Sequence, residues 1–287
     1  MSSSAGSTTR RAEAVRRAAV VTHGKPQVIG DALARVEEIA AGRGVELLFP
    51  GEELEKHGLA GDHGGISDAD LAVVLGGDGT MLRAFHRFLG TRVPVIGVNF
   101  GRVGFLTSIQ EPELEAGLSR AFDGDFRVVE LATLAAEAGG KSWPAVNDVV
   151  AHSAVLGRMV ELAWAIDGEE LGVLPCDGLI CCAPSGSTAY NLSNGGPVLV
   201  WGLDAMAITF VAPHSLHARP LVVPRGRDLT VSNETPDVPV TVLVDGHSVV
   251  EIGAGDSVVV RLTDQRSLLA VLPENTFFRR YRETFAS

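Results

Sequence analysis

The chain has 287 residues, 46% of them hydrophobic and 21% charged, which excludes disorder over most of its length and allows a substantial core. At about 150 residues per domain, this length predicts roughly two domains. The 24 Lys and Arg against 35 Asp and Glu give a net charge of −11, which argues against a broad surface for nucleic acid or an anionic membrane. No apolar run reaches the roughly 18 residues that a membrane-spanning helix requires.

Two features bear on the compartment of the protein. The first residues are rich in serine and lack the apolar stretch of a secretory signal, so we predict a disordered tail over 1–16. The arginines of this tail also give a weak likeness to an organelle transit peptide. The cysteines, Cys176, Cys181 and Cys182, are odd in number and clustered, so they predict neither a disulfide framework nor a Cys-x-x-Cys zinc pair. This usage favours a reducing compartment, and we expect a cytoplasmic protein.

The first 126 residues alternate strand-like apolar runs with helical patterns. The runs predict buried strands at 18–23, 45–49, 71–75 and 93–99, and the spacing between them predicts helices at 28–42, 80–89 and 111–122. The stretch 51–70 is polar and rich in glycine, which predicts a loop or a broken helix. Strands that alternate with helices imply right-handed crossovers and a parallel sheet, so we predict an α/β domain over 17–126.

Beyond about residue 126 the hydrophobic period changes to two. Turn signals such as Asp167-Gly168 and Asp245-Gly246 separate the short runs, which is typical of an all-β domain. We place this domain at 127–272. The last stretch, 273–287, is helical and basic, and we expect it to pack back on the first domain.

A glycine-rich loop, Gly76-Gly77-Asp78-Gly79-Thr80, lies where a buried strand passes into a helix. Glycine lets the backbone approach a ligand closely. The helix N-terminus, which Thr80 could cap, favours anions. We therefore predict a phosphate site formed by Gly76, Gly77, Gly79 and Thr80. The loop is neither a Walker A loop, since no lysine is near it in the sequence, nor a GxGxxG fingerprint.

Asp78 is the most informative residue of this loop. A carboxylate repels a phosphate, so an aspartate beside a phosphate site indicates a chemical role. It could bind Mg²⁺, or it could accept the proton of a hydroxyl that attacks a phosphoryl group. The alternative is a plain strand–turn–helix junction with an ordinary Asp. Since His23, His152 and His247 lack metal-ligand spacing, we assign no metal ligand.

A second polar stretch, 184–197, follows an apolar strand-like run and is dense in hydroxyl and amide groups. With Asp177 as the single charge nearby, it suits a neutral ligand such as a carboxamide, a base or a ribose, although it could be an ordinary connector. Asn147 and Asp148 are adjacent in another strand-like run, so their side chains point to opposite faces. A ribose diol would explain the pair, and so would a β-bulge or a strand edge.

With these residues the chain resembles the NAD kinase family, of the bacterial type, over nearly its whole length from about residue 18. The motifs that carry the resemblance are GGDGTMLRA (76–84), VNFGRVGFLT (98–107), VND (146–148), DGLICCAPSGSTAYNLSNGGPVL (177–199), APHSLHARP (212–220) and DGH (245–247). GGDGT alone also occurs in lipid kinases and phosphofructokinases. Its combination with the GSTAY and PHSL–RP motifs is highly specific to NAD kinases.

The resemblance implies a Rossmann-like N-terminal α/β domain, an all-β C-terminal domain and a final helix that returns to the first domain. It implies transfer of the γ-phosphoryl group of ATP, or possibly of polyphosphate, to the 2′-hydroxyl of the adenosine ribose of NAD, giving NADP. Mg²⁺ would come with ATP. A homodimer or homotetramer is expected, with no nucleic-acid or membrane partner. The rival functions are a lipid or sugar kinase that shares the GGDGT loop, and a dinucleotide sensor without catalysis.

The resemblance also implies roles for residues of the first domain and of the VND motif. Asp78 matches the catalytic proton acceptor, Gly79 a dinucleotide contact and Arg83 a position near the phosphates. Asn147 matches the ribose-binding Asn. Asp148 stands where the family usually has Glu, so its carboxylate has one methylene less reach.

Further dinucleotide contacts are implied in the second domain. Asp177 matches a contact to the nicotinamide or adenine side, and Arg158 falls near a basic family position. Ala212 and His247 match two more contacts, with His247 where Gln or Asn is more common. The block around the base and amide groups comprises Thr188, Ala189, Tyr190, Asn191, Leu192 and Ser193.

Overall fold

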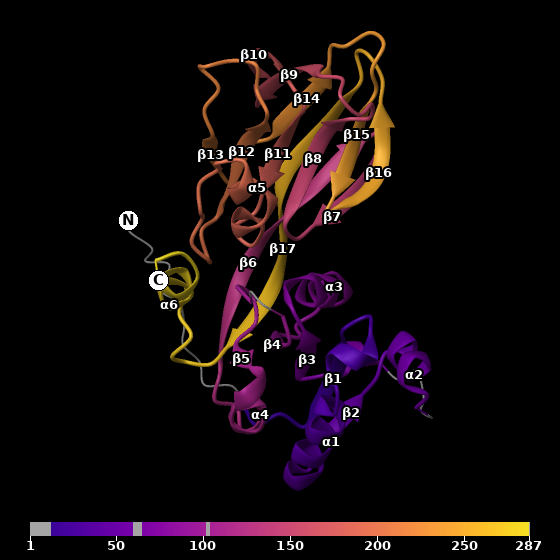
Figure 1. Cartoon of the computed structure of the whole chain (residues 1–287), viewed down its shortest axis with the longest axis vertical. Helices are drawn as coiled ribbons and strands as arrows, with labels where there is room; N and C mark the ends of the chain where they lie inside the picture. The colour runs from indigo at the N-terminus through magenta and orange to yellow at the C-terminus, as the bar shows by residue number, and fades with distance from the viewer. Residues whose placement is uncertain (1–12, 60–64, 102–103, 287) are drawn as a thin grey trace. The chain divides into compact units, whose positions relative to one another are not determined.

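The structure is a computed structural model that describes residues 13–59, 65–101 and 104–286 (Figure 1). The chain forms two compact units, one that ends at Glu130 and resumes at Ser267, and one that spans Leu131–Arg266. The sequence predicts the changes of domain at 126/127 and 272/273. The observed changes fall inside two long strands, β6 (Arg127–Ala138) and β17 (Ser257–Val271).

The first unit is built on a parallel sheet in the order β2–β1–β3–β4, with β5 beside β4. Its strands are β1 (Arg17–Thr22), β2 (Glu46–Leu48), β3 (Leu71–Gly76), β4 (Val95–Asn99) and β5 (Ile109–Gln110). Every residue of β3 and β4 is buried. A strand covered on both faces is typical of parallel sheets in α/β proteins, so the predicted fold of this unit is confirmed.

Four helices alternate with these strands: α1 (Ala32–Arg43), α2 (Gly51–His57), α3 (Asp78–Phe88) and α4 (Leu114–Phe122). Short 3-10 turns occur at η1 (Pro26–Val28), η2 (Ile66–Asp68) and η3 (Glu111–Glu113). The helix expected from residue 28 begins only at Ala32, because Gly30 takes a left-handed φ of +54°. Helices α1 and α4 lie side by side, and an ion pair joins Arg35 to Glu115 at 2.6 Å (Figure 1).

The last residues of the predicted tail over 1–16 are ordered in the part of the chain that the structure describes. Val15 is only 5% exposed, and its N–H donates to the carbonyl of Phe122 at 2.8 Å. An apolar side chain that joins the core of the first unit cannot belong to a disordered tail. Residues 1–12 of the predicted tail lie outside the described residues.

The C-terminal helix α6 (Phe277–Phe285) belongs to the first unit, as predicted. Its N-cap, Thr276, accepts a hydrogen bond from the N–H of Arg279. Phe277 packs edge-to-face on Phe105 with ring centroids 5.5 Å apart, and Arg280 donates to the carbonyl of Gly104 at 2.5 Å. The helix therefore braces residues 104–105.

The second unit consists of antiparallel strands, as the period of two predicted. One group runs in the order β10–β9–β14–β17, with β6 pairing β17 and β7, and the other in the order β13–β12–β11–β8–β15–β16. The further strands are β7 (Lys141–Ala145), β8 (Asp148–Ser153), β9 (Val160–Ile166), β10 (Glu169–Cys176), β11 (Gly178–Cys182), β12 (Ala205–Val211), β13 (Leu221–Pro224), β14 (Leu229–Asn233), β15 (Val240–Val244) and β16 (His247–Ile252). Two short helical turns interrupt them, η4 (Gly186–Thr188) and α5 (Tyr190–Ser193).

Both predicted Asp-Gly turns join neighbouring antiparallel strands. Asp167 and Asp245 take φ values of +50° and +48°, and each is followed by a glycine with positive φ. Asp tolerates this left-handed conformation better than most residues, which is why the dipeptide marks tight hairpins. No described helix has the length and apolar character needed to cross a membrane.

Candidate functional site

A pocket of about 310 Å³ lies at the N-terminus of α3, within the first unit. Its lining residues are His23, Gly24, Val28, Gly77, Gly79, Thr80, Arg83, Phe100 and Gly101. Three of the four predicted phosphate ligands, Gly77, Gly79 and Thr80, are among them. The fourth, Gly76, ends β3 and is buried.

The glycine loop forms because β3 passes into α3 without a spacer. A Cβ on Gly76 would lie 2.3 Å from Oγ1 of Thr80, so only glycine fits beneath the first turn of the helix. Gly77 is the N-cap, and no side chain caps the helix, so Thr80 does not have the capping role that the sequence suggested. Since α3 has 11 residues, its unpaired N–H groups present a partial positive charge at the pocket.

Asp78 is the first residue of α3 and stands between two glycines that line the pocket. Its carboxylate accepts the N–H of Phe105 at 2.9 Å and that of Leu106 at 2.9 Å. Burial raises the pKa of Asp78, while these two hydrogen bonds and the positive charge of Arg280 act in the opposite direction. Each oxygen keeps a lone pair, so the carboxylate can still accept a proton from a ligand.

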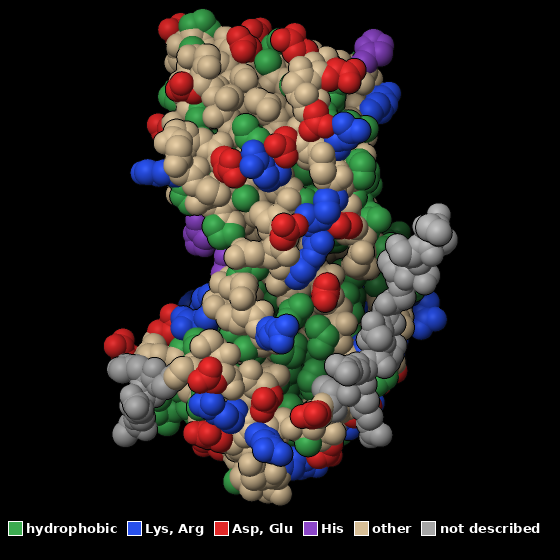
Figure 2. Space-filling model, turned by 180° about the vertical axis from the view of Figure 1, so that it is seen from behind, with side chains coloured by type: hydrophobic (Ala, Val, Ile, Leu, Met, Phe, Trp, Pro, Cys, Tyr) green, Lys and Arg blue, Asp and Glu red, His purple; other side chains and the backbone are tan. Residues whose placement is uncertain are grey.

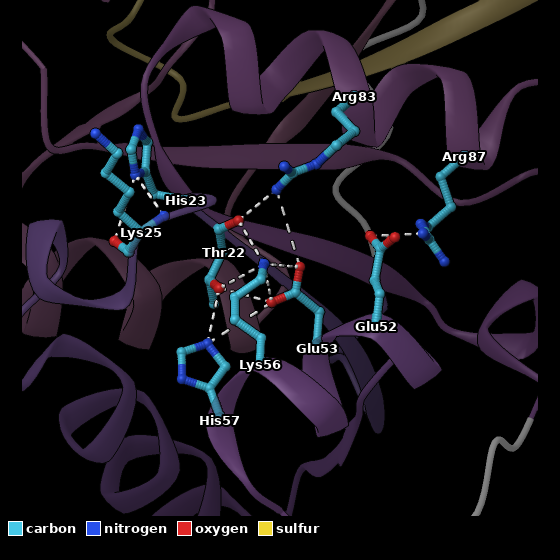
Figure 3. Close-up of polar contacts among 9 residues, drawn as sticks. All are labelled: Thr22, His23, Lys25, Glu52, Glu53, Lys56, His57, Arg83 and Arg87. Carbon is cyan, nitrogen blue, oxygen red and sulfur yellow. Dashed lines mark hydrogen bonds and ion pairs between the residues drawn. The ribbon is translucent and has the colours of Figure 1, made fainter.

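Arg83, on the second turn of α3, joins the pocket to a buried ionic cluster (Figure 3). Its guanidinium donates to the carbonyl of Thr22 and lies 3.9 Å from the carboxylate of Glu53. Glu53, on α2, is fully buried. It accepts hydrogen bonds from Thr22 Oγ1 at 2.6 Å and from Lys56 Nζ at 2.8 Å to both oxygens. The cluster holds Thr22 at the end of β1 in place, and it orients the guanidinium of Arg83.

Sequence reasoning missed Glu53 and Lys56, because the polar, glycine-rich stretch 51–70 predicts a loop or a broken helix. No lysine lies near the glycine loop in the sequence, yet Lys56 Nζ donates to the same Thr22 carbonyl as Arg83, at 3.2 Å. The spacing of Glu53 and Lys56, three residues apart on a short helix, was the only signal available.

In the second unit, Asn147 and Asp148 lie at the start of β8. Oδ1 of Asn147 is buried and has no hydrogen-bond partner among the described residues. Buried acceptor atoms in proteins normally receive a hydrogen bond, and a ligand hydroxyl could donate one to this oxygen. Asp148 is 7% exposed, and burial together with the negative charge of Asp245 raises its pKa to about 7.

The GSTAY block forms η4 and α5, close to this pair. A Cβ on Gly186 would lie 2.2 Å from the carbonyl oxygen of Asn147, so the two segments touch. Ala189, Tyr190 and Ser193 are exposed, and Thr188 and Leu192 are partly exposed, so all five can meet a ligand.

Asn191 has a different place from the one predicted. It is fully buried, donates through Nδ2 to the carbonyls of Ser187 and Pro197 at 3.0 Å each, and accepts from Thr209 Oγ1 at 2.7 Å. Its side chain is therefore an internal anchor that stabilises α5, rather than a surface that contacts a ligand.

The remaining predicted residues form two groups at opposite ends of β8 and β11. His247 follows the Asp245-Gly246 turn, near Asp148. Asp177 and Ala212 flank the pair Gly178–Val211, and the carbonyl of Asp177 accepts the N–H of Ser153 at the far end of β8, where the loop with Arg158 begins. Because β8 has 6 residues, roughly 17 Å of strand separates the two ends.

No group of three or more His, Cys, Asp or Glu among the described residues could hold a metal ion. The cysteines Cys176, Cys181 and Cys182 are buried free thiols, and burial raises the pKa of Cys176 and Cys182 to about 12.

Comparisons with known proteins show the family of the chain. The family model of the ATP-NAD kinase N-terminal domain matches residues 58–126, and that of the ATP-NAD kinase C-terminal domain matches residues 146–271. The NAD kinase of Gemmatimonas aurantiaca is 38% identical over 219 residues, which cover 74% of this chain and 76% of that protein. The NAD kinase of Heliobacterium modesticaldum is 40% identical over 219 residues, which cover 75% and 77%. The chain belongs to the NAD kinase family.

Two solved structures extend this result to the fold. An NAD kinase from Archaeoglobus fulgidus in complex with ATP matches with a TM-score of 0.75 at 27% identity, over 94% of this chain and 97% of that one. A yeast NADH kinase complexed with NADH shares the fold, with a TM-score of 0.83 at 22% identity, over 96% and 88%. As a member of the NAD kinase family the chain is a kinase, so the predicted family, fold class and enzyme class are confirmed.

Proposed function

We propose that this NAD kinase family member transfers the γ-phosphoryl group of ATP to the 2′-hydroxyl of the adenosine ribose of NAD, giving NADP. The observation that carries the proposal is the placement of Asp78. Its carboxylate stands at the N-terminus of α3, next to two glycines that line the pocket, and two peptide N–H groups orient it.

Asp78 is the proposed proton acceptor. A sugar hydroxyl has a pKa far above 7, so it needs a positioned base to release its proton as it attacks. The bond from the ribose 2′-oxygen to the γ-phosphorus forms, the bond from that phosphorus to the β–γ bridging oxygen breaks, and the proton passes to Asp78. Burial raises the pKa of Asp78, which makes it a stronger base than an exposed carboxylate.

The phosphate chain of ATP would occupy the pocket at the glycine loop. The backbone N–H of Gly79 and the partial charge of α3 suit the phosphate oxygens, and Thr80 and Arg83 line the same pocket. Mg²⁺ would be carried by the nucleotide and, when bound, would neutralise charge on its phosphates. Polyphosphate has the same repeating anionic chemistry and is the alternative donor.

Residues of the second unit would bind the dinucleotide. The unpaired Oδ1 of Asn147 suits a ribose hydroxyl, and Asp148 beside it offers a second acceptor. The side chains that would surround the base and amide groups are those of Thr188, Ala189, Tyr190, Leu192 and Ser193. His247, at the start of β16, would add a further contact.

A homodimer or homotetramer is part of the proposal. Asp177, Ala212 and Arg158 lie at the other end of β8 from Asn147 and Asp148. An assembly in which a second copy supplies that group would let all the predicted residues serve one dinucleotide. A cytoplasmic location stays a prediction.

An assay of NADP formation tests the proposal. The purified chain is given ATP, Mg²⁺ and NAD, and NADP is detected with a dehydrogenase that accepts only NADP. We expect Asp78→Asn to lower kcat by roughly 100-fold or more, because the amide cannot accept the proton. Asp123→Asn is the matched control, since Asp123 is an exposed residue of the same unit that pairs with Arg43 at 3.4 Å.

Three outcomes would contradict the proposal. A wild-type chain that phosphorylates a lipid or a sugar but not NAD would assign it to the rival kinases. A chain that binds NAD without forming NADP would be a sensor. An Asp78→Asn variant as active as Asp123→Asn would remove Asp78 from the chemistry.

A further inference from the structure

The backbone of the segment 146–148 is held by one distant carboxylate. The N–H groups of Val146, Asn147 and Asp148 donate to the side chain of Asp245 at 2.7, 2.7 and 2.9 Å. Three consecutive peptide N–H groups around one anion form a concave binding arrangement of the kind that backbone nests provide. Hydrogen bonds to an ionised acceptor are about twice as strong as neutral ones.

The carbonyl groups of the same segment are also satisfied. Ser185 Oγ donates to the carbonyl of Val146 at 2.5 Å, and the N–H of Ala183 donates to that of Asn147 at 2.8 Å. The N–H of Asp245 donates to the carbonyl of Asp148 at 3.0 Å. Asp245 thus makes four of the six hydrogen bonds that fix the segment, and the position of the segment depends on it more than on any other residue.

The anchoring has an electrostatic cost. Asp245 is 9% exposed, and its negative charge opposes the ionisation of Asp148. An uncharged residue would avoid this repulsion, but no uncharged side chain offers enough lone pairs for three N–H groups. Asp245 directly follows β15, takes a positive φ of +48°, and directs its carboxylate to the start of β8.

We propose that Asp245 is a positioning residue that holds Asn147 and Asp148 in place for the dinucleotide. The inference rests on the proposed binding of ribose by these two residues. Asp245 itself acts through the backbone of the segment and not through the substrate. Its removal frees the three N–H groups and lets Asn147 move away from the ribose.

The chain contains a matched control for this proposal. Asp167 occupies the same kind of Asp-Gly turn in the same unit, with a φ of +50°. Its carboxylate accepts the N–H of Asp228 at 2.8 Å and pairs with Arg227 at 2.6 Å, and it has no bond to the segment 146–148. The substitutions Asp245→Asn and Asp245→Gly are therefore compared with Asp167→Asn and Asp167→Gly. Asn and Gly both accept positive φ, so turn strain is the same in each pair.

The first measurement is steady-state kinetics with NAD and with ATP. We expect KM for NAD to rise about tenfold or more in Asp245→Gly, and by less in Asp245→Asn, which keeps one oxygen acceptor. KM for ATP should change by less than about twofold, because the glycine-loop pocket is unaffected. KM does not depend on the fraction of folded enzyme, so partial unfolding cannot raise KM for NAD while KM for ATP stays the same. The Asp167 variants should leave both constants unchanged.

The second measurement is hydrogen exchange of the peptide that covers 146–148. The three amides should exchange faster in both Asp245 variants than in wild type, and at the wild-type rate in the Asp167 variants. Equal exchange and equal KM for NAD in the Asp245 and Asp167 variants would overturn the inference. If wild type forms no NADP, the proposed function fails, and the exchange measurement still decides whether Asp245 anchors the segment.

Discussion

Two carboxylates of the candidate site, Asp78 and Asp148, are set in opposite environments. Asp78 receives two peptide N–H bonds and lies near the positive Arg280, which together offset part of its burial. Asp148 faces the negative Asp245, so its neighbour adds to the effect of burial and its pKa reaches about 7. Burial raises the pKa of both carboxylates, but the neighbours of Asp78 oppose this effect whereas the neighbour of Asp148 adds to it.

The raised pKa of Asp148 predicts how stability changes with pH. Its pKa is about 7 in the folded chain, against an ordinary value of 3.8 for an aspartate, so between about pH 4 and 7 the folded chain keeps a proton that the unfolded chain has lost. The contribution of Asp148 to stability therefore falls as pH rises through this window. Asp148→Asn should gain stability over wild type from pH 4 to 7, by on the order of a few kcal/mol in urea unfolding.

Asp167→Asn serves as the control for this pH dependence. Arg227 lowers the pKa of Asp167, the opposite direction, so this variant should show no gain on going from pH 4 to 7. A constant difference in unfolding free energy between wild type and Asp148→Asn from pH 4 to 8 would contradict the prediction.

At the scale of elements, α2 is attached to β1 and α3 through buried charges (Figure 3). Glu53 is fully buried and Lys56 is 16% exposed at its side chain. Glu53→Ala would leave Lys56 and Arg83 without their counter-charge, and we expect a loss of about 3–5 kcal/mol in urea unfolding. Glu52→Ala is the control, because Glu52 is 47% exposed and pairs with Arg87 at the surface, which predicts a loss of at most about 1 kcal/mol.

A double substitution separates the two causes of that loss. Glu53→Leu combined with Lys56→Met removes both charges and should recover a large part of the stability lost in Glu53→Ala. Equal losses in Glu53→Ala and Glu52→Ala would show that the cluster does not hold α2 in place.

The C-terminal helix α6 influences the pKa of Asp78, the proposed proton acceptor, through Arg280. Arg280 is 7% exposed, donates to Gly104 and lowers the pKa of Asp78. Arg280→Met should therefore raise the pKa of Asp78 and shift the acid limb of the kcat–pH profile to higher pH, since the base must be ionised. Arg279→Met is the control, because Arg279 is exposed and pairs with Glu283 at 2.8 Å. An unshifted acid limb in Arg280→Met would contradict the coupling.

At the scale of the whole molecule, two strands carry the chain from one unit to the other. The first residues of β17 pair with β14 of the second unit, and Leu269 pairs with Val95 of β4 in the first. The sequence places the two domain boundaries at the start of β6 and just after β17, whereas the units change inside these strands. Neither strand contains a turn signal that would mark the change.

The charge of the whole chain shows how ATP must be attracted. With a net charge of −11, bulk electrostatics repel a nucleotide. On the face shown in Figure 2, acidic and basic side chains alternate without a field of one sign. In the proposed function, attraction is therefore local, from the N-terminus of α3, from Arg83 and from the metal that would come with the nucleotide.

The sequence by itself determined most of the helices and strands of the first unit and the position of the glycine loop between a strand and a helix. Apolar periods of 3.6 and two, the Asp-Gly turns and the strand–GGDGT–helix junction are local features, so a few neighbouring residues suffice to specify them. The stretch 51–70 was left open between a loop and a broken helix, and the late start of α1 was missed, because polar residues and a glycine with positive φ weaken the local pattern there.

Only the tertiary structure decided which residues surround each group. Asp245 meets the segment 146–148 across 97 to 99 residues of sequence, and Arg83 meets Thr22 across 61. It also decided that Asn191 is an internal anchor while Tyr190 beside it is exposed. A period of two tells which face a residue takes, but strand register and order set its neighbours, and these follow from packing of the whole chain.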